Sequence, residues 1–439
     1  MTEKMLGINA REFTRVHHWV AGLQWLLFMF ANTVVIPISI GNAMHMSGAA
    51  ITSSMQRSFF YTGFASLLQL LFGHELPIME GQSGVWWGAI LGVLATAQES
   101  GMTPLQAGGS LETGIVISGV IIVVLGWLGM GNVLKKWFTP IASSVFLMLL
   151  ATELISIFMK GMLGLSNHAE ISLPTSLLSI ALIAIVMVIQ MSRFQKIRNY
   201  SILLGIALGW VVFRLAIEPA TGVAPAGISS LWAFTPWGPF GTDWGIVLTA
   251  VAAGLINASN TVATLESAKP IFHVETTKKM YQKSFLITGI NTIISGFLGL
   301  VPYAPYTSSL GFLRSTQLFS RIPFAIGAIL FMILGLVPSV GAFFATLPVS
   351  VGDAVLLVAY LQLFGSAMQY IEGKTFDHLT IFRLALPVLI GLGIFTIAPG
   401  AFVTLPAAVR PFLSNGLLVG VLIAIVFENT IKWNIAKQK

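Results

Sequence analysis

Two apolar stretches of this chain are interrupted in the same way, and they stand at matching places in its two halves. Residues 77–87 read PIMEGQSGVWW, and residues 302–311 read PYAPYTSSLG. Both place proline, glycine and small polar residues where a membrane helix would otherwise continue, and freed backbone groups are tolerated at that depth only beside protein or a watery cavity. Paired interruptions in corresponding segments are the best sequence indication of a carrier's substrate site. The pattern therefore predicts a membrane carrier whose substrate binds at the two breaks.

The composition leaves too few charged residues for a conventional water-facing surface. Apolar residues make up 56% of the chain and charged residues 9%, and the mean hydropathy is +0.87, whereas an ordinary soluble domain has about 25% charged residues. Stretches of about 20 apolar residues recur, each long enough to cross a hydrocarbon core of about 30 Å. The polar start, residues 1–15, predicts that no cleavable signal peptide is present. Because the chain contains no cysteine, disulfides and thiolate metal sites are excluded.

The apolar pattern predicts an all-α polytopic membrane protein with fourteen spans. They are roughly 19–41, 52–73, 77–98, 112–133, 138–159, 174–192, 198–217, 244–264, 283–300, 301–318, 323–345, 349–370, 380–399 and 411–431. Charge supports this number, because cytoplasmic loops collect Lys and Arg. If the chain starts inside and alternates, the outer side receives only four basic residues, Arg57, Lys160, Arg214 and Arg410.

The inner side then receives nineteen of the 23 basic residues. These are Lys4, Arg11, Arg15, Lys135, Lys136, Arg193, Lys196, Arg198, Lys269, Lys278, Lys279, Lys283, Arg314, Arg321, Lys374, Arg383, Lys432, Lys437 and Lys439. The asymmetry predicts a multi-pass protein of the cytoplasmic membrane with both termini in the cytoplasm. The same asymmetry accounts for the net charge of +7, because the basic residues lie in short inner loops beside lipid headgroups. We therefore expect a lipid bilayer, and no nucleic acid, as a partner.

The spans divide into two halves of seven, residues 1–217 and 218–439, joined by a loop rich in proline and glycine. An odd number of spans in each half makes the second half inverted relative to the first. The broken spans are then numbers three and ten, and they can meet near the midplane. We expect short extended segments at 81–85 and 306–309 to pair or face each other. The helices that restart after them would direct their N-terminal N–H groups toward the cavity.

Five stretches together resemble a known family. They are 23–37 (LQWLLFMFANTVVIP), 77–86, 140–154 (PIASSVFLMLLATEL), 295–302 (SGFLGLVP) and 347–349 (LPV). Their order and spacing resemble the nucleobase/ascorbate transporters, such as the bacterial uracil and xanthine permeases. The resemblance implies a core domain of spans one to four and eight to eleven, and a gate domain of the remaining spans. It also implies a nucleobase bound between them, transport driven by protons or sodium, and polar contacts from spans eight and ten.

The chain departs from the family pattern at those contacts. The acidic position of span eight falls on Ser259, and a polar position downstream of it falls on Ala263. The polar pair that opens the span-ten signature is Ser308 and Ser309, and the histidine of span one is Trp25. These changes keep hydrogen-bonding capacity but remove charge. They leave open which nucleobase is carried and whether protons or sodium drive the transport.

The acidic residues at membrane depth are candidates for carrying a proton, because an ionisable group there is costly and by default functional. Glu80 lies inside the first break, although it could instead cap freed N–H groups. Glu266 lies two turns beyond Ser259 on the same helix face, where it could take the acidic role of span eight or pair with Lys269. We expect a proton rather than sodium as the coupling cation.

The predicted substrate-binding residues are polar, small or aromatic side chains at the breaks and in the spans facing them. Trp86 offers an aromatic face for a flat substrate, and buried amides offer donors and acceptors to a base edge, though packing and interhelical hydrogen bonds explain them as well. The set is Gln24, Asn32, Gln82, Ser83, Gly84, Val85, Trp86, Asn257, Ser259, Asn260, Tyr306, Thr307, Ser308 and Ser309.

Signatures of catalysis are absent from the sequence. No His or Cys spacing typical of a metal site and no phosphate-binding loop occurs, so we expect no enzyme, no cofactor and no metal. The favoured function is secondary active import of a purine or pyrimidine nucleobase by alternating access. The alternatives are an inorganic-anion or carboxylate carrier of the same inverted-repeat class, which would need a cation near the site, and a non-transporting membrane scaffold or sensor. A homodimer is left open.

Overall fold

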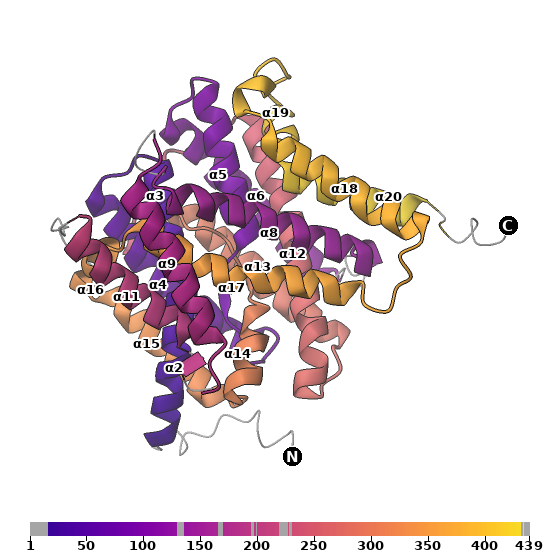
Figure 1. Cartoon of the computed structure of the whole chain (residues 1–439). Helices are drawn as coiled ribbons and strands as arrows, with labels where there is room; N and C mark the ends of the chain where they lie inside the picture. Colours follow the sequence, from indigo (N-terminus) through magenta and orange to yellow (C-terminus); the bar gives the residue numbers. More distant parts are fainter. Residues whose placement is uncertain are drawn as a thin grey trace.

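The computed structural model describes residues 16–129, 136–165, 170–194, 197–198, 200–218, 227, 231–431 and 433. Within them the chain is mostly helical (Figure 1), with two short buried strands. The first half contains α2 (Val16–Thr33), α3 (Val35–Ala43), α4 (Gly48–Phe72), β1 (Glu80–Gln82), α5 (Gly84–Glu99), α6 (Pro104–Trp127), α8 (Pro140–Met162), α9 (Leu173–Gln190) and α11 (Ser201–Ala216).

The second half repeats the order of a strand between helices. It contains α12 (Trp244–Phe272), α13 (Lys278–Leu298), β2 (Tyr303–Pro305), α14 (Ser308–Thr316), α15 (Arg321–Leu336), α16 (Pro338–Ala345), α17 (Val349–Tyr370), α18 (His378–Thr396), η3 (Pro399–Phe402), α19 (Arg410–Leu413) and α20 (Gly416–Thr430). In each half the strand precedes a shortened helix, α5 or α14.

Helix packing crosses between the halves of the chain. α13 packs on α6, α15 packs on α2 and α4, and α12 packs on α6 and α5. In a second set, α8 packs on α17 and α20, α18 packs on α20 and α8, and α9 and α11 pack on each other and on α17. We call α2 to α6 with α12 to α16 the core helices, and α8, α9, α11, α17, α18 and α20 the gate helices. Whether they move as two domains stays a prediction.

Seven of the described helices are long and apolar enough to cross a membrane, or eight if α15 and α16, which are bent by 87°, form one span. Other helices do not meet this criterion of length and apolar composition, for physical reasons. α4 and α13 are long but bury polar side chains such as Gln56, Gln69 and Thr288 inside the protein, and α5 and α14 are shortened by the breaks. The fold is that of a multi-helical membrane protein, and the number fourteen stays a prediction.

Several residues on which the predicted membrane orientation depends lie outside the described residues. This applies to both chain termini and to eight of the basic residues assigned to the inner side, Lys4, Arg11, Arg15, Lys135, Lys196, Lys432, Lys437 and Lys439. Part of the loop between the halves, residues 219–226 and 228–230, also lies outside them. The cytoplasmic position of the termini therefore stays a prediction.

The two breaks meet in an antiparallel pair of strands. β1 pairs with β2 in the register Glu80 with Pro305, Gly81 with Ala304 and Gln82 with Tyr303. The extended segment of the second break therefore lies three residues earlier than we predicted, because the chain already turns into α14 at Ser308. A Cβ on Gly81 would lie 2.9 Å from the ring of Tyr306, so only glycine lets this ring close over the first strand.

Candidate functional site

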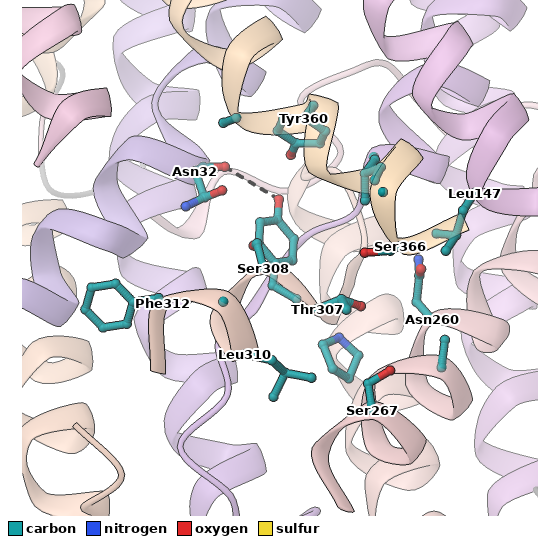
Figure 2. A pocket seen from close by; sticks show the side chains of 18 of the residues that line it. Asn32, Leu147, Asn260, Ser267, Thr307, Ser308, Leu310, Phe312, Tyr360 and Ser366 are labelled. Carbon is teal, nitrogen blue, oxygen red and sulfur yellow. Dashed lines mark hydrogen bonds between the residues drawn. The ribbon is translucent and has the colours of Figure 1, made fainter. Parts of the chain in front are cut away.

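A cavity of about 790 Å³ lies where the two breaks meet the gate helices. Core residues line it from α2, α5, α12, β2 and α14, and gate residues line it from α8, α11 and α17. Figure 2 labels side chains from both sets that line it, and the labelled polar ones are Asn32, Asn260, Ser267, Thr307, Ser308, Tyr360 and Ser366. The cavity is thus shared between core and gate helices.

The first break ends in a capped helix. Ser83 is extended before α5, and its hydroxyl accepts the N–H of Val85 at 3.2 Å and donates to Oδ1 of Asn257 at 2.5 Å. Asn257 in turn donates to the carbonyl of Tyr303 at 3.0 Å, and Asn260 donates to Oδ1 of Asn257 at 3.0 Å. Side-chain capping satisfies an N–H that has no partner inside the helix. These bonds tie α12 to both breaks and fix the wall of the cavity.

The second break starts its helix differently. Thr307 precedes α14 without a side-chain cap, and its hydroxyl lies 2.8 Å from the hydroxyl of Thr264, which donates to the carbonyl of Pro305 at 3.1 Å. Ser309 is buried and accepts the N–H of Met79 at 3.2 Å. Ser308 is exposed to the cavity. A helix N-terminus carries partial positive charge, so α14 offers Ser308 and its own first turn to an electron-rich group.

Aromatic rings cover one side of the cavity. Phe28 of α2 and Phe312 of α14 line it, with ring centroids 4.8 Å apart, and Trp25 lies buried behind them, 4.6 Å from Phe312. The sequence reasoning missed both Phe residues, although Phe28 lies one turn before Asn32 and Phe312 one turn after Ser308. Residues at this spacing share a helix face, so that spacing could have identified them.

Two tyrosines complete the lining, one from the second break and one from a gate helix. Tyr306 follows β2, and its hydroxyl donates to the backbone carbonyls of Asn32, at 3.5 Å, and of Gln82. Tyr360 belongs to the gate helix α17. No sequence pattern indicated Tyr360, because it lies far from either break.

Half of the predicted binding residues line the cavity. They are Asn32, Ser83, Gly84, Asn260, Tyr306, Thr307 and Ser308. The others do not line it, and they are Gln24, Gln82, Val85, Trp86, Asn257, Ser259 and Ser309. Trp86 is fully buried, with its ring 3.1 Å from the position a Cβ on Gly254 would take. Ser259 is 3% exposed on α12.

The two candidate proton carriers lie apart from the cavity lining. Glu80 is fully buried in β1 and accepts a hydrogen bond from the hydroxyl of Thr288 at 2.7 Å. Glu266 pairs with Lys269 at 2.8 Å and accepts from Thr276 at 3.1 Å and from the hydroxyl of Tyr281. Among the described residues, no group of three or more His, Cys, Asp or Glu side chains is placed to hold a metal ion.

Two arginines line the cavity, which the sequence reasoning did not foresee. Arg314 comes from α14, and Arg198 lies just before α11. Both side chains are exposed. Neither arginine belongs to a break, but the packing of core against gate brings both to one cavity.

The fold is shared with solved membrane transporters. It superposes on the transmembrane domain of a cyanobacterium bicarbonate transporter, BicA, with a TM-score of 0.60 and 15% identity, covering 95% of this chain and 98% of that one. It superposes on SLC26A9 with a TM-score of 0.65 and 13% identity, covering 97% and 67%. Such low identities show a common fold alone. Paired broken helices around a polar cavity are the arrangement expected of a membrane carrier.

Sequence comparison identifies the family. Residues 17–400 match the model of the Permease family, and the chain belongs to it. It is 27% identical over 429 residues to YwdJ of Bacillus subtilis (strain 168), covering 95% of this chain and 97% of that protein. It is 23% identical over 421 residues to the xanthine permease of the same organism, covering 93% and 92%. The resemblance inferred from the motifs is confirmed, and the protein is a permease and not an enzyme.

Proposed function

We propose that this permease imports a purine or pyrimidine nucleobase across the cytoplasmic membrane by proton symport with alternating access. The observation that carries the proposal is the cavity at the meeting point of the two breaks, because it combines aromatic rings with polar groups. Phe28, Phe312 and Tyr306 offer flat faces, and Asn260 and Ser308 offer hydrogen-bond donors and acceptors. A flat heterocycle with a polar edge needs both kinds of contact.

The relatives support the substrate class. One is the xanthine permease of Bacillus subtilis, and another is the uric acid transporter UacT of Escherichia coli (strain K12), which is 22% identical over 419 residues and covers 93% of this chain and 85% of that protein. Both names denote carriers of oxidised purines. We therefore place purines first among the nucleobases to be tested.

We propose the topology in the same terms. Residues 1–217 and 218–439 form two inverted repeats of seven spans, with both termini in the cytoplasm. The core helices move as one domain against the gate helices, and each repeat contributes a broken span to the cavity. The pairing of β1 with β2 supports this arrangement, because it places the two breaks side by side at the centre of the molecule.

We propose Glu80 as the group that carries the coupling proton, with Glu266 as the next candidate. Glu80 is a fully buried carboxyl in the first break, where an unpaired charge is costly. Among the described residues, its Oε1 is bonded to Thr288, and no partner is recorded for its Oε2. Glu266 is engaged by Lys269. This contact makes Glu266 the weaker candidate.

A second candidate function is transport of an inorganic anion or a carboxylate. Arg198 and Arg314 favour it, because both guanidinium groups border the cavity and planar guanidinium groups bind carboxylates well. The aromatic lining favours a nucleobase, because a small anion gains little from three rings. The two arginines also suit a weakly acidic nucleobase. Anion transport and nucleobase transport therefore differ only in whether the substrate must contain an aromatic ring.

The deciding experiment is uptake into liposomes that contain the purified protein. An inward proton gradient is imposed, and labelled purines, pyrimidines, sulfate and dicarboxylates are offered in turn. Accumulation of a nucleobase that collapses with the gradient is the expected result. Transport of sulfate or a dicarboxylate, with no transport of any nucleobase, would show that the protein is an anion carrier. If correctly folded protein transports none of these compounds, the scaffold or sensor function is the one that remains.

A further inference from the structure

Helix α5 presents a row of glycines to the gate helices. Gly84, Gly88 and Gly92 are spaced by four residues, so they lie on one face of the helix. A Cβ on Gly84 would lie 3.0 Å from Leu154 of α8, and a Cβ on Gly88 would lie 2.4 Å from the carboxyl of Glu153, also of α8. Glycines allow helix backbones to approach closely. Core and gate thus touch here through the bare backbone of α5.

A buried carboxyl group points into this contact. Glu153 is 7% exposed, and its Oε1 accepts a long hydrogen bond of 3.4 Å from Asn415 at the start of α20. Among the described residues, no partner is recorded for its Oε2, which lies 2.4 Å from the Cβ position of Gly88. An ionised carboxylate with one long hydrogen bond in a dry interface is strongly disfavoured. The interface as seen here suits the neutral acid.

Other charged groups near these helices are directed elsewhere. Asp353 of α17 contacts α8 at Gly161, two turns beyond Glu153. Arg383 of α18 pairs with Glu428 of α20, and Arg410 of α19 donates to the hydroxyl of Ser100 at 2.9 Å. Two more charged residues, Glu99 on α5 and Lys160 on α8, lie at the far ends of those helices. The proton on Glu153 is therefore governed by its solvent access more than by a neighbouring charge.

The glycine spacing gives this carboxyl a second place to fit. Four residues of helix rise by about 6 Å, so a shift of α5 by one turn would bring Gly84 opposite Glu153 in place of Gly88. Gly84 and Leu150 line the cavity, whereas Gly88 and Glu153 do not. The shifted carboxyl would therefore reach the edge of the cavity, where water can solvate its charge. At both positions the residue of α5 opposite the carboxyl is a glycine, and the shift also carries the ring of Trp87 past Phe158 of α8, from which its centroid lies 5.5 Å away.

We propose that Glu153 is a protonation site in the sliding interface between core and gate, and that its protonation state selects the conformation. The neutral acid favours the arrangement described here. Release of its proton to cavity water favours the shifted arrangement, in which the carboxylate is solvated. The inference rests on the proposed alternating access, but it does not depend on the identity of the substrate. It assigns to Glu153 a role separate from that of Glu80, which is buried among core helices only.

The test needs no substrate. Because the chain has no cysteine, Ala263→Cys places a single thiol in the cavity lining, and its reaction with a membrane-impermeant maleimide is followed from acidic to alkaline pH. Rates are divided by those of Glu372→Cys, an exposed position, to cancel the ionisation of the thiol itself. We expect the ratio to change several-fold with pH, and Glu153→Gln to hold it at its acidic value throughout. The proposal is overturned if this ratio of labelling rates does not change with pH in proteins that retain Glu153. It is also overturned if the ratio still changes with pH after Glu153→Gln is added.

Matched glycine variants test the sliding contact. Gly88→Ala places a methyl group against the carboxyl, whereas Gly393→Ala in α18 meets nothing within 4 Å. We expect Gly88→Ala to lose the pH response and Gly393→Ala to keep it. If Gly88→Ala does not fold, Gly92→Ala replaces it, because its Cβ would lie 3.4 Å from Asn415 and so intrudes less; it should weaken the response. A full response in the folded glycine variants contradicts the sliding contact. Failure of nucleobase uptake would leave these readouts intact and would count only against the proposed substrate.

Discussion

The two half-length helices behind the breaks look equivalent in the sequence but differ in the structure. α5 has 16 residues, begins with the capping side chain of Ser83, and buries Val85, Trp86 and Trp87 completely. α14 has 9 residues, begins without a side-chain cap, and exposes Ser308 toward the cavity. Repeated breaks therefore need not repeat a role. We expect α5 to form part of the contact between core and gate, and α14 to present the groups that face the substrate.

The residues after each break explain the difference. α5 consists mostly of small and large apolar residues, and most of them are buried against α12, α6, α8 and α3. In α14, polar residues such as Ser308 and Ser315 line the cavity, whereas Leu313 is buried and does not line it, so one face packs and the other faces the cavity. A helix with one polar face needs a watery or polar neighbour. Substitutions in α14 should therefore change substrate handling, and those in α5 should change stability or movement.

The largest effect is expected for Ser308→Leu. The new side chain would project from the first turn of α14 into the cavity and take the place of the substrate, so transport should be abolished. Uptake of labelled purines into liposomes measures it, with Ser308→Ala as the control that removes the hydroxyl without adding bulk. Normal uptake by Ser308→Leu would show that α14 does not face the substrate and would erase the contrast with α5.

Glu80→Gln should separate binding from accumulation. Glutamine imitates the protonated carboxyl and can still accept the hydrogen bond of Thr288, so exchange of substrate across the membrane should persist. Accumulation driven by a proton gradient should fall to the equilibrium level. Glu75→Gln is the control, because that side chain is 44% exposed and pairs with Lys283 at the surface. Gradient-driven uptake in Glu80→Gln would exclude Glu80 and leave Glu266, or a sodium ion, as the next candidate.

The sequence predicted the breaks and the family but only part of the site. Proline and glycine inside apolar stretches identify a break directly, because such residues interrupt helices for local reasons. Which side chains then face the cavity depends on helix rotation and on packing between distant segments. Asn32 and Ser308 were found because they are polar residues in apolar surroundings. Tyr360 was missed, because only the packing of α17 against the core brings it to the cavity.

Ser83→Ala should reveal the different starts of the two helices. Loss of a capping hydroxyl costs about 0.5–2 kcal/mol, and Ser83 also loses its 2.5 Å hydrogen bond to Asn257. Thr307→Ala removes no helix cap, since none is formed there. We therefore expect Ser83→Ala to lower the thermal stability of the detergent-solubilised protein more than Thr307→Ala does. Equal losses would mean that the cap at α5 contributes nothing beyond an ordinary hydroxyl.

The smallest effects should come from removing single hydroxyls, and they decide how far the site extends along α12. Ser308→Ala deletes one neutral hydrogen bond to substrate, a loss of about 0.5–1.5 kcal/mol, which corresponds to about a 2- to 13-fold weaker affinity. Ser259 aligns with the acidic position of the family, but it is buried and does not line the cavity. We therefore expect Ser259→Ala to leave the affinity within about twofold, well below one tenfold step of 1.4 kcal/mol. Competition binding of a labelled purine measures both variants. An equal loss in Ser259→Ala would place the substrate deeper, between α12 and the first break, and α5 would then share the substrate contact that we assign to α14.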